Sequence, residues 1–190
     1  MGLFSKIKGA LSNESSSETP LSASFATRDD TIYAPVNGML VTLGEIHDET
    51  VSKGLLGEGC GILPMGGSVL RAPMNGRVMA TTVTNHSIGL LGEGGQQVIM
   101  HVGIDTVKME GKGFRRFVEA NDEVKAGQPL LGFDPQAIRD AGYEDVVIVA
   151  ITNSEDYPEI MHVSASATLL GGRPLMKIGD PLLITRAAQE

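Results

Sequence analysis

The chain has 190 residues, a hydrophobic fraction of 42% and a formal net charge of -8 at pH 7. These values are typical of a globular protein, and an acidic balance without clustered Lys and Arg excludes a broad nucleic-acid interface. The single cysteine excludes an internal disulfide, and no apolar run approaches the roughly 20 residues of a membrane span. We therefore expect a cytoplasmic protein.

The first 30 residues predict a flexible segment ahead of a folded domain at 31–190. Residues 1–11 place four apolar side chains at helical spacing beside two lysines, which predicts a short helix able to contact an acidic membrane surface weakly, at the inner face. A frayed tail is the alternative, because so short a helix is marginal in water. Residues 12–28 are rich in Ser, Thr and Glu, a composition typical of a linker.

From residue 31 onward, short apolar runs rich in Val, Ile and Thr alternate with Gly, Pro and Asn, the pattern of an all-β domain. Internal similarity adds to this, because residues 33–43 return as 71–81 and residues 125–133 are echoed at 177–185. Each Ala-Pro-x-Asn-Gly segment predicts a turn that leads into a strand. We expect two related halves folded together.

Two short helices are also expected, one with an apolar face over residues 114–118 and one between a capping Asp134 and Gly142. Residues 146–152 are apolar without alternation, which predicts a strand buried on both faces. The predicted fold class is all-β: a compact antiparallel β-sandwich or barrel, built from a duplicated motif, with one or two short helices.

Two of the four histidines, the side chains that normally titrate near neutral pH, flank one candidate hairpin. With its turn centred on residues 93–94, His86 lies directly opposite His101, with the Cβ atoms about 5 Å apart. Ile88 and Ile99 share that face and form an apolar patch suited to docking another protein. A slip of one residue in the register would move one histidine to the opposite face.

Two facing imidazoles favour either nucleophilic catalysis or metal binding. A neutral imidazole attacks phosphorus directly, and a second imidazole, fixed by a hydroxyl such as that of Thr84, can donate a hydrogen bond to the phosphoryl oxygens. This chemistry requires no cofactor. The alternative is a zinc-dependent hydrolase in which His86 and His101 bind the metal together with Asp48 or Asp105.

The sequence around the remaining reactive side chains does not predict a chemical role for them. Cys60 has no adjacent base, and we expect it to be a small buried residue. His47 and His162 are expected on the surface or in loops. The glycine-rich segments lack the Gly-Lys-Ser/Thr ending of a phosphate-binding loop, so the sequence does not favour nucleotide binding.

The motif TNH at 84–86, followed by HVGIDTV at 101–107, resembles the glucose-class enzyme IIA proteins of the bacterial phosphoenolpyruvate-dependent sugar phosphotransferase system. The resemblance extends over about residues 31–184 and includes the segments APVNG, VKAGQPLL, VVIVAITN and GDPLLI. It implies a compact antiparallel β-sandwich built from a duplicated motif, in agreement with the internal repeats.

The resemblance also implies a relay. A histidine phosphocarrier protein donates a phosphoryl group to His101, which passes it to a cysteine on the IIB domain of a sugar permease. His86 corresponds to the partner histidine, and Thr84 corresponds to the residue that supports it. Asp105 corresponds to a carboxylate that meets an arginine of the phosphocarrier, and Asp48 to a second carboxylate near the site.

The surface around the site is expected to bind these partners. Thr82, Ile99 and Val102 stand where the family commonly has phenylalanine, and with Ile88 they would keep most of the patch apolar. The family resemblance also allows a zinc ion shared between the two histidines and a partner protein, and it allows regulatory target proteins that respond to phosphorylation.

A third reading is a biotinyl- or lipoyl-type carrier domain. The segments APMNG at 72–76 and VKM at 107–109 imitate the lysine-bearing hairpin of those domains, with Lys108 as the modified residue. The imitation is incomplete, because the VKAGQPLL segment, which precedes the lysine in such carriers, follows Lys108 here.

Overall fold

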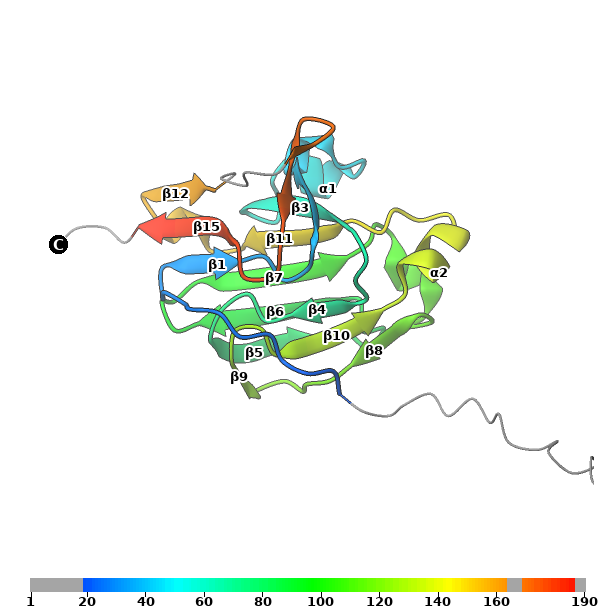
Figure 1. The fold of residues 1–190 in the computed structure, drawn as a ribbon, viewed down its shortest axis with the longest axis horizontal. Coiled ribbons are helices and arrows are strands. Elements are labelled where there is room, and N and C mark those ends of the chain that lie inside the picture. Colours follow the sequence, from blue (N-terminus) through cyan, green and yellow to red (C-terminus); the bar gives the residue numbers. More distant parts are fainter. Residues whose placement is uncertain (1–18, 164–168, 187–190) are drawn as a thin grey trace, which may run out of the picture.

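The computed structural model describes residues 19–163 and 169–186, and its regular structure is almost entirely β (Figure 1). None of the described helices is long and apolar enough to cross a membrane. The strands are β1 Thr31–Tyr33, β2 Gly38–Thr42, β3 Glu58–Pro64, β4 Val69–Arg71, β5 Gly76–Thr81, β6 Ser87–Gly92, β7 Gln97–Val102, β8 Phe114–Arg116, β9 Glu123–Val124, β10 Pro129–Phe133, β11 Val147–Ile151, β12 Glu159–His162, β13 Leu169–Leu170, β14 Arg173–Met176 and β15 Pro181–Arg186. The helices are α1 Glu49–Ser52 and α2 Pro135–Asp140, with 3-10 turns η1 Leu43–Glu45, η2 Thr106–Met109 and η3 Ser154–Asp156.

The described strands form three sheets in which the paired strands are antiparallel. The largest has nine strands in the order β13-β14-β2-β3-β11-β7-β6-β5-β9, and two small sheets have the orders β1-β15-β12 and β4-β10-β8. In Figure 1 the small sheets lie in front of the large one. The predicted antiparallel β-sandwich is confirmed.

A hydrophobic core lies between the large sheet and the small ones. Leu70 of β4 and Leu131 of β10 belong to the same buried cluster as Leu90 of β6 and Met100 of β7, and all four are 0% exposed. Each such side chain stabilises the fold by about 1.5–3 kcal/mol relative to an exposed one. The inner face of β6 and β7 is thus occupied by the core, which leaves their outer face for a functional site.

The two halves predicted from the repeats are related in space. The Tyr33 N–H donates a hydrogen bond to the Pro73 carbonyl at 2.9 Å, and the Arg71 N–H donates to the Pro35 carbonyl at 3.0 Å, so the two Ala-Pro-x-Asn-Gly segments bind each other reciprocally. The strand before each segment pairs with a later strand, β1 with β15 and β4 with β10. The predicted duplicated motif is confirmed.

Local signals predicted α2 and β11 correctly. The Asp134 carboxylate accepts hydrogen bonds from the N–H groups of Gln136 and Ala137 at 3.0 and 3.1 Å, and the helix ends before Gly142, which has a φ of +84°. All five residues of β11 are buried, because this strand lies in the middle of the large sheet between β3 and β7.

The helix predicted over residues 114–118 is wrong. Phe114 begins the strand β8, which pairs with β10 so that Phe114 is opposite Phe133. Phe114 packs against the core from this strand, and Val118, 5% exposed, belongs to the same cluster. Pairing with β10 gives the segment a ladder of hydrogen bonds, whereas an isolated helix of that length would be unstable.

The segment before β1 follows the surface of the domain (Figure 1). The Ala23 N–H donates a hydrogen bond to the Gly127 carbonyl at 3.0 Å, and the Phe25 ring packs on that of Tyr33 with centroids 5.3 Å apart. The final part of the segment predicted to be flexible is therefore attached to the domain. The amphipathic helix predicted for residues 1–11 lies outside the described residues.

Candidate functional site

The hairpin of β6 and β7 has a register one residue different from the predicted one. The Gly92 N–H donates to the Gln96 carbonyl at 2.8 Å, which closes a loop of three residues, 93–95, with Gly95 at a φ of +85°. His101 is therefore opposite Ser87. The predicted two-residue turn was wrong, because a turn that ends in a left-handed glycine places one more residue in the loop.

The two imidazole rings meet even in this register. The ring centroids of His86 and His101 are 4.8 Å apart, at an interplanar angle of 76°. His86 precedes β6 and follows Asn85, whose φ of +57° turns the chain, so its side chain does not obey the alternation of a strand. The His86 carbonyl still accepts a hydrogen bond from the Val102 N–H at 2.8 Å. The approach is diagonal across the end of the hairpin.

The register corrects two of the predicted partner contacts. Ile88 and Val102 belong to the core and are 1% and 0% exposed, so neither is available to a partner. A shift of one residue turns Ile88 to the face opposite His101, and Val102 alternates with its neighbour His101 in β7. Ile99, two residues before His101, keeps the outward face and is partly exposed.

His86 is held by hydroxyl groups. The Thr84 Oγ1 lies 2.6 Å from the His86 Nδ1, as the resemblance implied, and the Thr82 Oγ1 lies 3.5 Å from the same nitrogen. His86 is 7% exposed, and burial lowers its pKa below the usual value. When the Thr84 hydroxyl donates to Nδ1, the proton of the neutral ring is on Nε2.

His101 is partly exposed, but one of its two ring nitrogens is not. Its Nδ1 is buried and has no hydrogen-bond partner among the described residues. Burial, followed by the neighbouring His86, lowers the pKa of His101 to about 4, while the Gly103 backbone and the Asp48 carboxylate act in the opposite direction. The ring is therefore neutral at pH 7, and the buried Nδ1 is not the nitrogen that another molecule can reach.

The chain turns sharply after His101, and sequence reasoning assigned no role to the residues that make this turn. Gly103 has a φ of +77°, and a Cβ atom there would lie 2.4 Å from the Thr106 Cγ2 and 2.8 Å from the Glu144 carbonyl. Thr106 is 0% exposed, and its hydroxyl donates to the Val102 carbonyl at 2.6 Å. This turn brings Asp105 near the histidines.

The low pKa of His101 predicts a pH-dependent stability. Its pKa is about 4 in the folded protein and 6.5 in the reference state, so between these values the unfolded chain binds more protons. Stability from this group is complete above pH 6.5 and is lost as the pH falls towards 4. From pH 7 to pH 5 we expect wild type to lose about 2 kcal/mol more unfolding free energy than His101→Gln does. Urea denaturation at both pH values measures this, and equal losses would contradict it.

A hollow of about 220 Å³ opens beside His101. Two carboxylates line it. Asp48 accepts a hydrogen bond from the Val51 N–H at 2.9 Å at the start of α1, and Asp105 is exposed and 2.6 Å from the Lys108 Nζ. The other lining residues are Thr50, Val51, Leu56, Ile104, Thr106, Val107 and Ile148. The structure thus brings Asp48 and Asp105 together with His101, as the resemblance implied.

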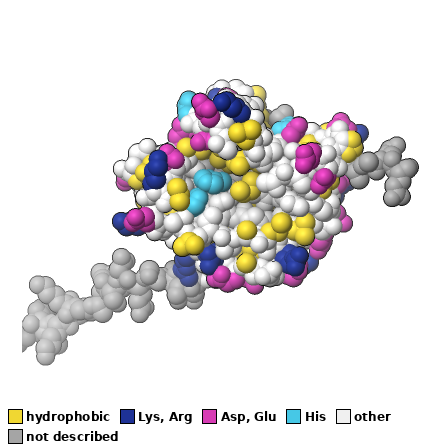
Figure 2. Space-filling view, turned by 180° about the vertical axis from the view of Figure 1, so that it is seen from behind, with side chains coloured by type: hydrophobic (Ala, Val, Ile, Leu, Met, Phe, Trp, Pro, Cys, Tyr) yellow, Lys and Arg dark blue, Asp and Glu magenta, His cyan; other side chains and the backbone are white. Residues whose placement is uncertain are grey.

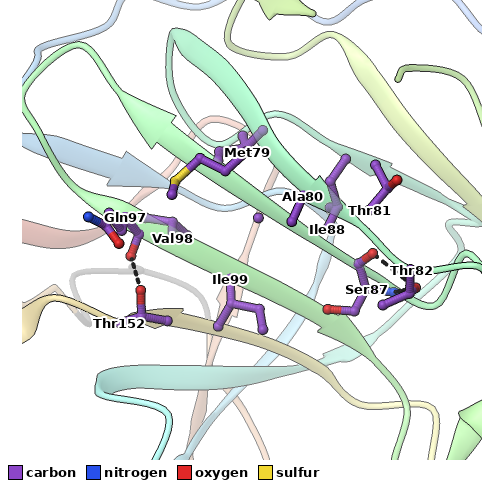
Figure 3. A pocket seen from close by; sticks show the side chains of 12 residues that line it. Met79, Ala80, Thr81, Thr82, Ser87, Ile88, Gln97, Val98, Ile99 and Thr152 are labelled. Carbon is purple, nitrogen blue, oxygen red and sulfur yellow. Dashed lines mark hydrogen bonds between the residues drawn. The ribbon is translucent and has the colours of Figure 1, made fainter. Parts of the chain in front are cut away.

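A second hollow, of about 250 Å³ and mostly apolar, lies along β5, β6 and β7 (Figure 3). Ile99 lines it from β7, and Met79, 46% exposed, lines it from β5. Two further exposed apolar side chains, Val83 at 97% and Val107 at 52%, follow β5 and β7 in sequence. In Figure 2 histidine side chains reach the surface in the middle of this face, with hydrophobic atoms near them and most charged side chains towards the edge.

The geometry does not support the two alternative functions. Within the described ranges, no group of three or more His, Cys, Asp and Glu side chains is placed to hold a metal ion, so His86, His101 and an aspartate do not form the site of a zinc hydrolase. Lys108 lies in the 3-10 turn η2, paired with Asp105, whereas a carrier domain presents its lysine on a β-hairpin.

The other reactive side chains, Cys60, His47 and His162, do not belong to the candidate site. Cys60 is buried in β3, and burial raises its pKa to about 12, which makes the thiol unreactive. His47 is exposed and bonds Glu144 at 2.7 Å, and His162, at the end of β12, bonds Glu58 at 3.1 Å. Neither histidine lines the hollows beside His101.

Comparison with known proteins yields consistent matches. Residues 30–157 match the family model described as phosphoenolpyruvate-dependent sugar phosphotransferase system, EIIA 1. The glucose-specific EIIA component of Staphylococcus epidermidis is 37% identical over 141 residues, which are 74% of this chain and 84% of that protein. The beta-glucoside-specific EIIBCA component of Dickeya chrysanthemi is 40% identical over 153 residues, 80% of this chain but 24% of that protein. Among solved structures, the glucose permease IIA from Mycoplasma capricolum matches with a TM-score of 0.66 and 26% identity, over 81% of this chain and 94% of that one.

Proposed function

The chain belongs to the EIIA 1 family of the phosphoenolpyruvate-dependent sugar phosphotransferase system, and on that premise we propose that it relays a phosphoryl group on the Nε2 atom of His101. The observation that carries this proposal is the pair of neutral imidazoles with ring centroids 4.8 Å apart, of which the partly exposed His101 ring has its Nδ1 buried. The family provides the phosphoryl relay, and the geometry supports His101 as the residue that performs it.

Acceptance of the phosphoryl group begins with the lone pair of Nε2. The neutral His101 ring keeps its proton on the buried Nδ1, near the Gly103 backbone, so Nε2 is free to attack phosphorus. The new P–Nε2 bond forms as the P–N bond to the histidine of the donor breaks, and the donor nitrogen takes back the electron pair. Because the pKa of His101 is about 4, the nucleophile stays unprotonated throughout the neutral range.

His86 stabilises the phosphoryl group during both transfers. The Thr84 hydroxyl bonds the His86 Nδ1 at 2.6 Å, which leaves the Nε2–H of His86 free to donate beside the neighbouring ring of His101. That N–H donates a hydrogen bond to a phosphoryl oxygen, where negative charge accumulates as the P–N bond breaks. The residue acts as a hydrogen-bond donor, and no bond to phosphorus forms on it.

We propose the histidine phosphocarrier protein as the donor. Asp48 and Asp105 border the hollow beside His101, so a cationic side chain of the donor finds two carboxylates there. The Asp105 carboxylate is paired with Lys108 in the free chain, and both side chains are more than half exposed, so exchange of one cation for another costs little.

The acceptor is a IIB domain of a sugar permease. Relatives such as the EIIBCA component of Dickeya chrysanthemi join the A component to B and C components in one protein. We propose that the apolar hollow bordered by Met79 and Ile99 contacts the protein partners, because apolar surface next to His101 can pack against either partner without selecting one charge pattern (Figure 3).

The relay requires no cofactor in this proposal. A zinc ion at His86 and His101 would need further ligands from a partner, since the described residues contribute two histidines and no third donor in position. Phosphorylation places nearly two negative charges on this face, which gives regulatory target proteins a feature to recognise.

The test is phosphorylation of the purified chain. We expect incubation with phosphoenolpyruvate and the two general relay proteins to add one acid-labile phosphoryl group, which peptide mapping at alkaline pH places on His101. Omission of the phosphocarrier should prevent labelling. A stable phosphate on another residue, or no labelling with active relay proteins, would contradict the proposal.

A further inference from the structure

The turn that carries Thr84 and His86 lies outside the regular strands, although the His86 carbonyl accepts a hydrogen bond from the Val102 N–H of β7. β5 ends at Thr81 and β6 begins at Ser87, so the residues between them rely on other contacts. Val83 at the tip of the turn is 97% exposed and packs on little. Asn85 has a φ of +57°, a left-handed conformation that asparagine adopts more readily than most residues other than glycine. The orientation of a hydrogen bond made by His86 therefore depends on how firmly this turn is held.

Hydrogen bonds made by Thr82 hold the base of the turn. The Thr82 hydroxyl donates to the Ser87 carbonyl and accepts from the Ser87 N–H, both at 3.2 Å (Figure 3). The Asn85 N–H donates to the Thr82 carbonyl at 3.1 Å. These bonds close the turn upon itself and onto the first residue of β6, but none of them reaches another sheet.

The contact with a different sheet comes from Arg116, at the end of β8. One guanidinium nitrogen donates to the Asn85 Oδ1 at 2.9 Å and to the Thr82 carbonyl at 3.3 Å. The other terminal nitrogen donates to Glu119 at 2.8 Å, and the Arg116 side chain is 23% exposed. The chain leading to β8 also passes close by, since a Cβ atom on Gly111 would lie 3.6 Å from the Thr84 carbonyl.

We propose that Arg116 is a positioning residue of the relay, which acts through Thr82 and Asn85 to fix the turn and so directs the Nε2–H of His86. This inference rests on the proposed function of His86. The contacts use the planar fork of a guanidinium, with one arm on the turn and the other on Glu119. A lysine has a single nitrogen on a flexible chain and cannot make both sets of contacts in one geometry.

The third nitrogen of the Arg116 guanidinium has no such contact. The Nε of Arg116 is buried and has no partner among the described residues. An unsatisfied buried donor is unfavourable, and such a group in a native protein calls for an explanation. The side chain accepts this deficit while it reaches the carbonyl of Thr82 and the amide oxygen of Asn85.

The experiment compares Arg116→Gln with Arg115→Gln, which removes the same charge from the adjacent position of β8, where Arg115 stacks over Phe117. We expect Arg116→Gln to accept phosphate within twofold of wild type and to donate it to IIB about tenfold more slowly. Nitrogen NMR of the His86 ring should show a smaller fraction of the tautomer protonated on Nε2. Arg115→Gln should change neither reading, and Arg116→Lys should donate as slowly as Arg116→Gln.

A double-mutant cycle separates positioning from general stability. If Arg116 acts through His86, Arg116→Gln has no further effect on donation in a His86→Gln background. An additive loss in the double variant would overturn the proposal, as would unchanged donation together with an unchanged His86 tautomer. Absence of phosphorylation in wild type would instead refute the relay itself, and the NMR measurement would still report whether Arg116 orients the ring.

Discussion

His101→Gln is expected to abolish phosphoryl acceptance, with a loss of about 10⁴-fold or more. Glutamine is neutral like the native ring and similar in length, so the side chain keeps its place beside His86 and the hollow. Its amide nitrogen has no available lone pair and cannot form a bond to phosphorus. No neighbouring side chain can substitute, because His86 is 7% exposed and its Nδ1 is occupied by Thr84.

The measurement is the rate and extent of labelling from phosphoenolpyruvate through the two general relay proteins. His162→Gln is the matched control, since His162 is an exposed histidine bonded to Glu58, away from the site, and this variant should label like wild type. Stoichiometric labelling of the His101 variant would show that the phosphoryl group resides elsewhere. Circular dichroism and urea denaturation at pH 7 check that the variant is folded.

His86→Gln is expected to separate the two half-reactions. The variant should accept phosphate within about tenfold of wild type but pass it to IIB about 10²- to 10³-fold more slowly, because a flexible amide replaces the donor that the Thr84-held imidazole keeps fixed. Acceptance suffers less because the donor brings its own groups to the phosphoryl oxygens. Single-turnover transfer from the labelled variant to the IIB domain measures the second step directly.

Thr84→Val provides the companion variant. It keeps the His86 ring but removes the hydroxyl that lies 2.6 Å from Nδ1, so donation should fall by about tenfold, in the same direction and by less than with His86→Gln. Thr84→Ser retains the hydroxyl and should donate near the wild-type rate. Wild-type donation by His86→Gln would remove His86 from the mechanism.

The parts of the fold that were predicted from the sequence rest on local chemistry. Asp134 and Gly142 bracket α2 because a carboxylate caps free N–H groups and glycine tolerates positive φ, whatever the rest of the chain does. The duplicated turns could be recognised because the motif Ala-Pro-x-Asn-Gly occurs twice in the sequence. The strand β8 was missed because its pairing with β10 is a tertiary contact, which overrides the weak helical pattern of residues 114–118.

The candidate site could be predicted only in part from local sequence patterns. The pair His86 and His101 was predicted from one hairpin, and the rings do meet, although the three-residue loop 93–95 shifts the register. The same shift sent Ile88 into the core, because side chains alternate with a period of two. The role proposed for Arg116 could not be predicted from the sequence. Its partners in the turn, Asn85 and Thr82, lie 31 and 34 residues earlier, and no local motif links them to it.

The burial of Nδ1 in His101 has a kinetic consequence. In the proposed relay both transfers use Nε2, since Nδ1 is buried, so we expect the phosphoryl donor and the phosphoryl acceptor to occupy the same space in turn. The exchange is therefore a ping-pong cycle with no ternary complex, and each partner competitively inhibits the other at high concentration. On this proposal, the fraction of phosphorylated chains reflects the balance between the rate of phosphoryl supply and the rate of phosphoryl transfer to the acceptor.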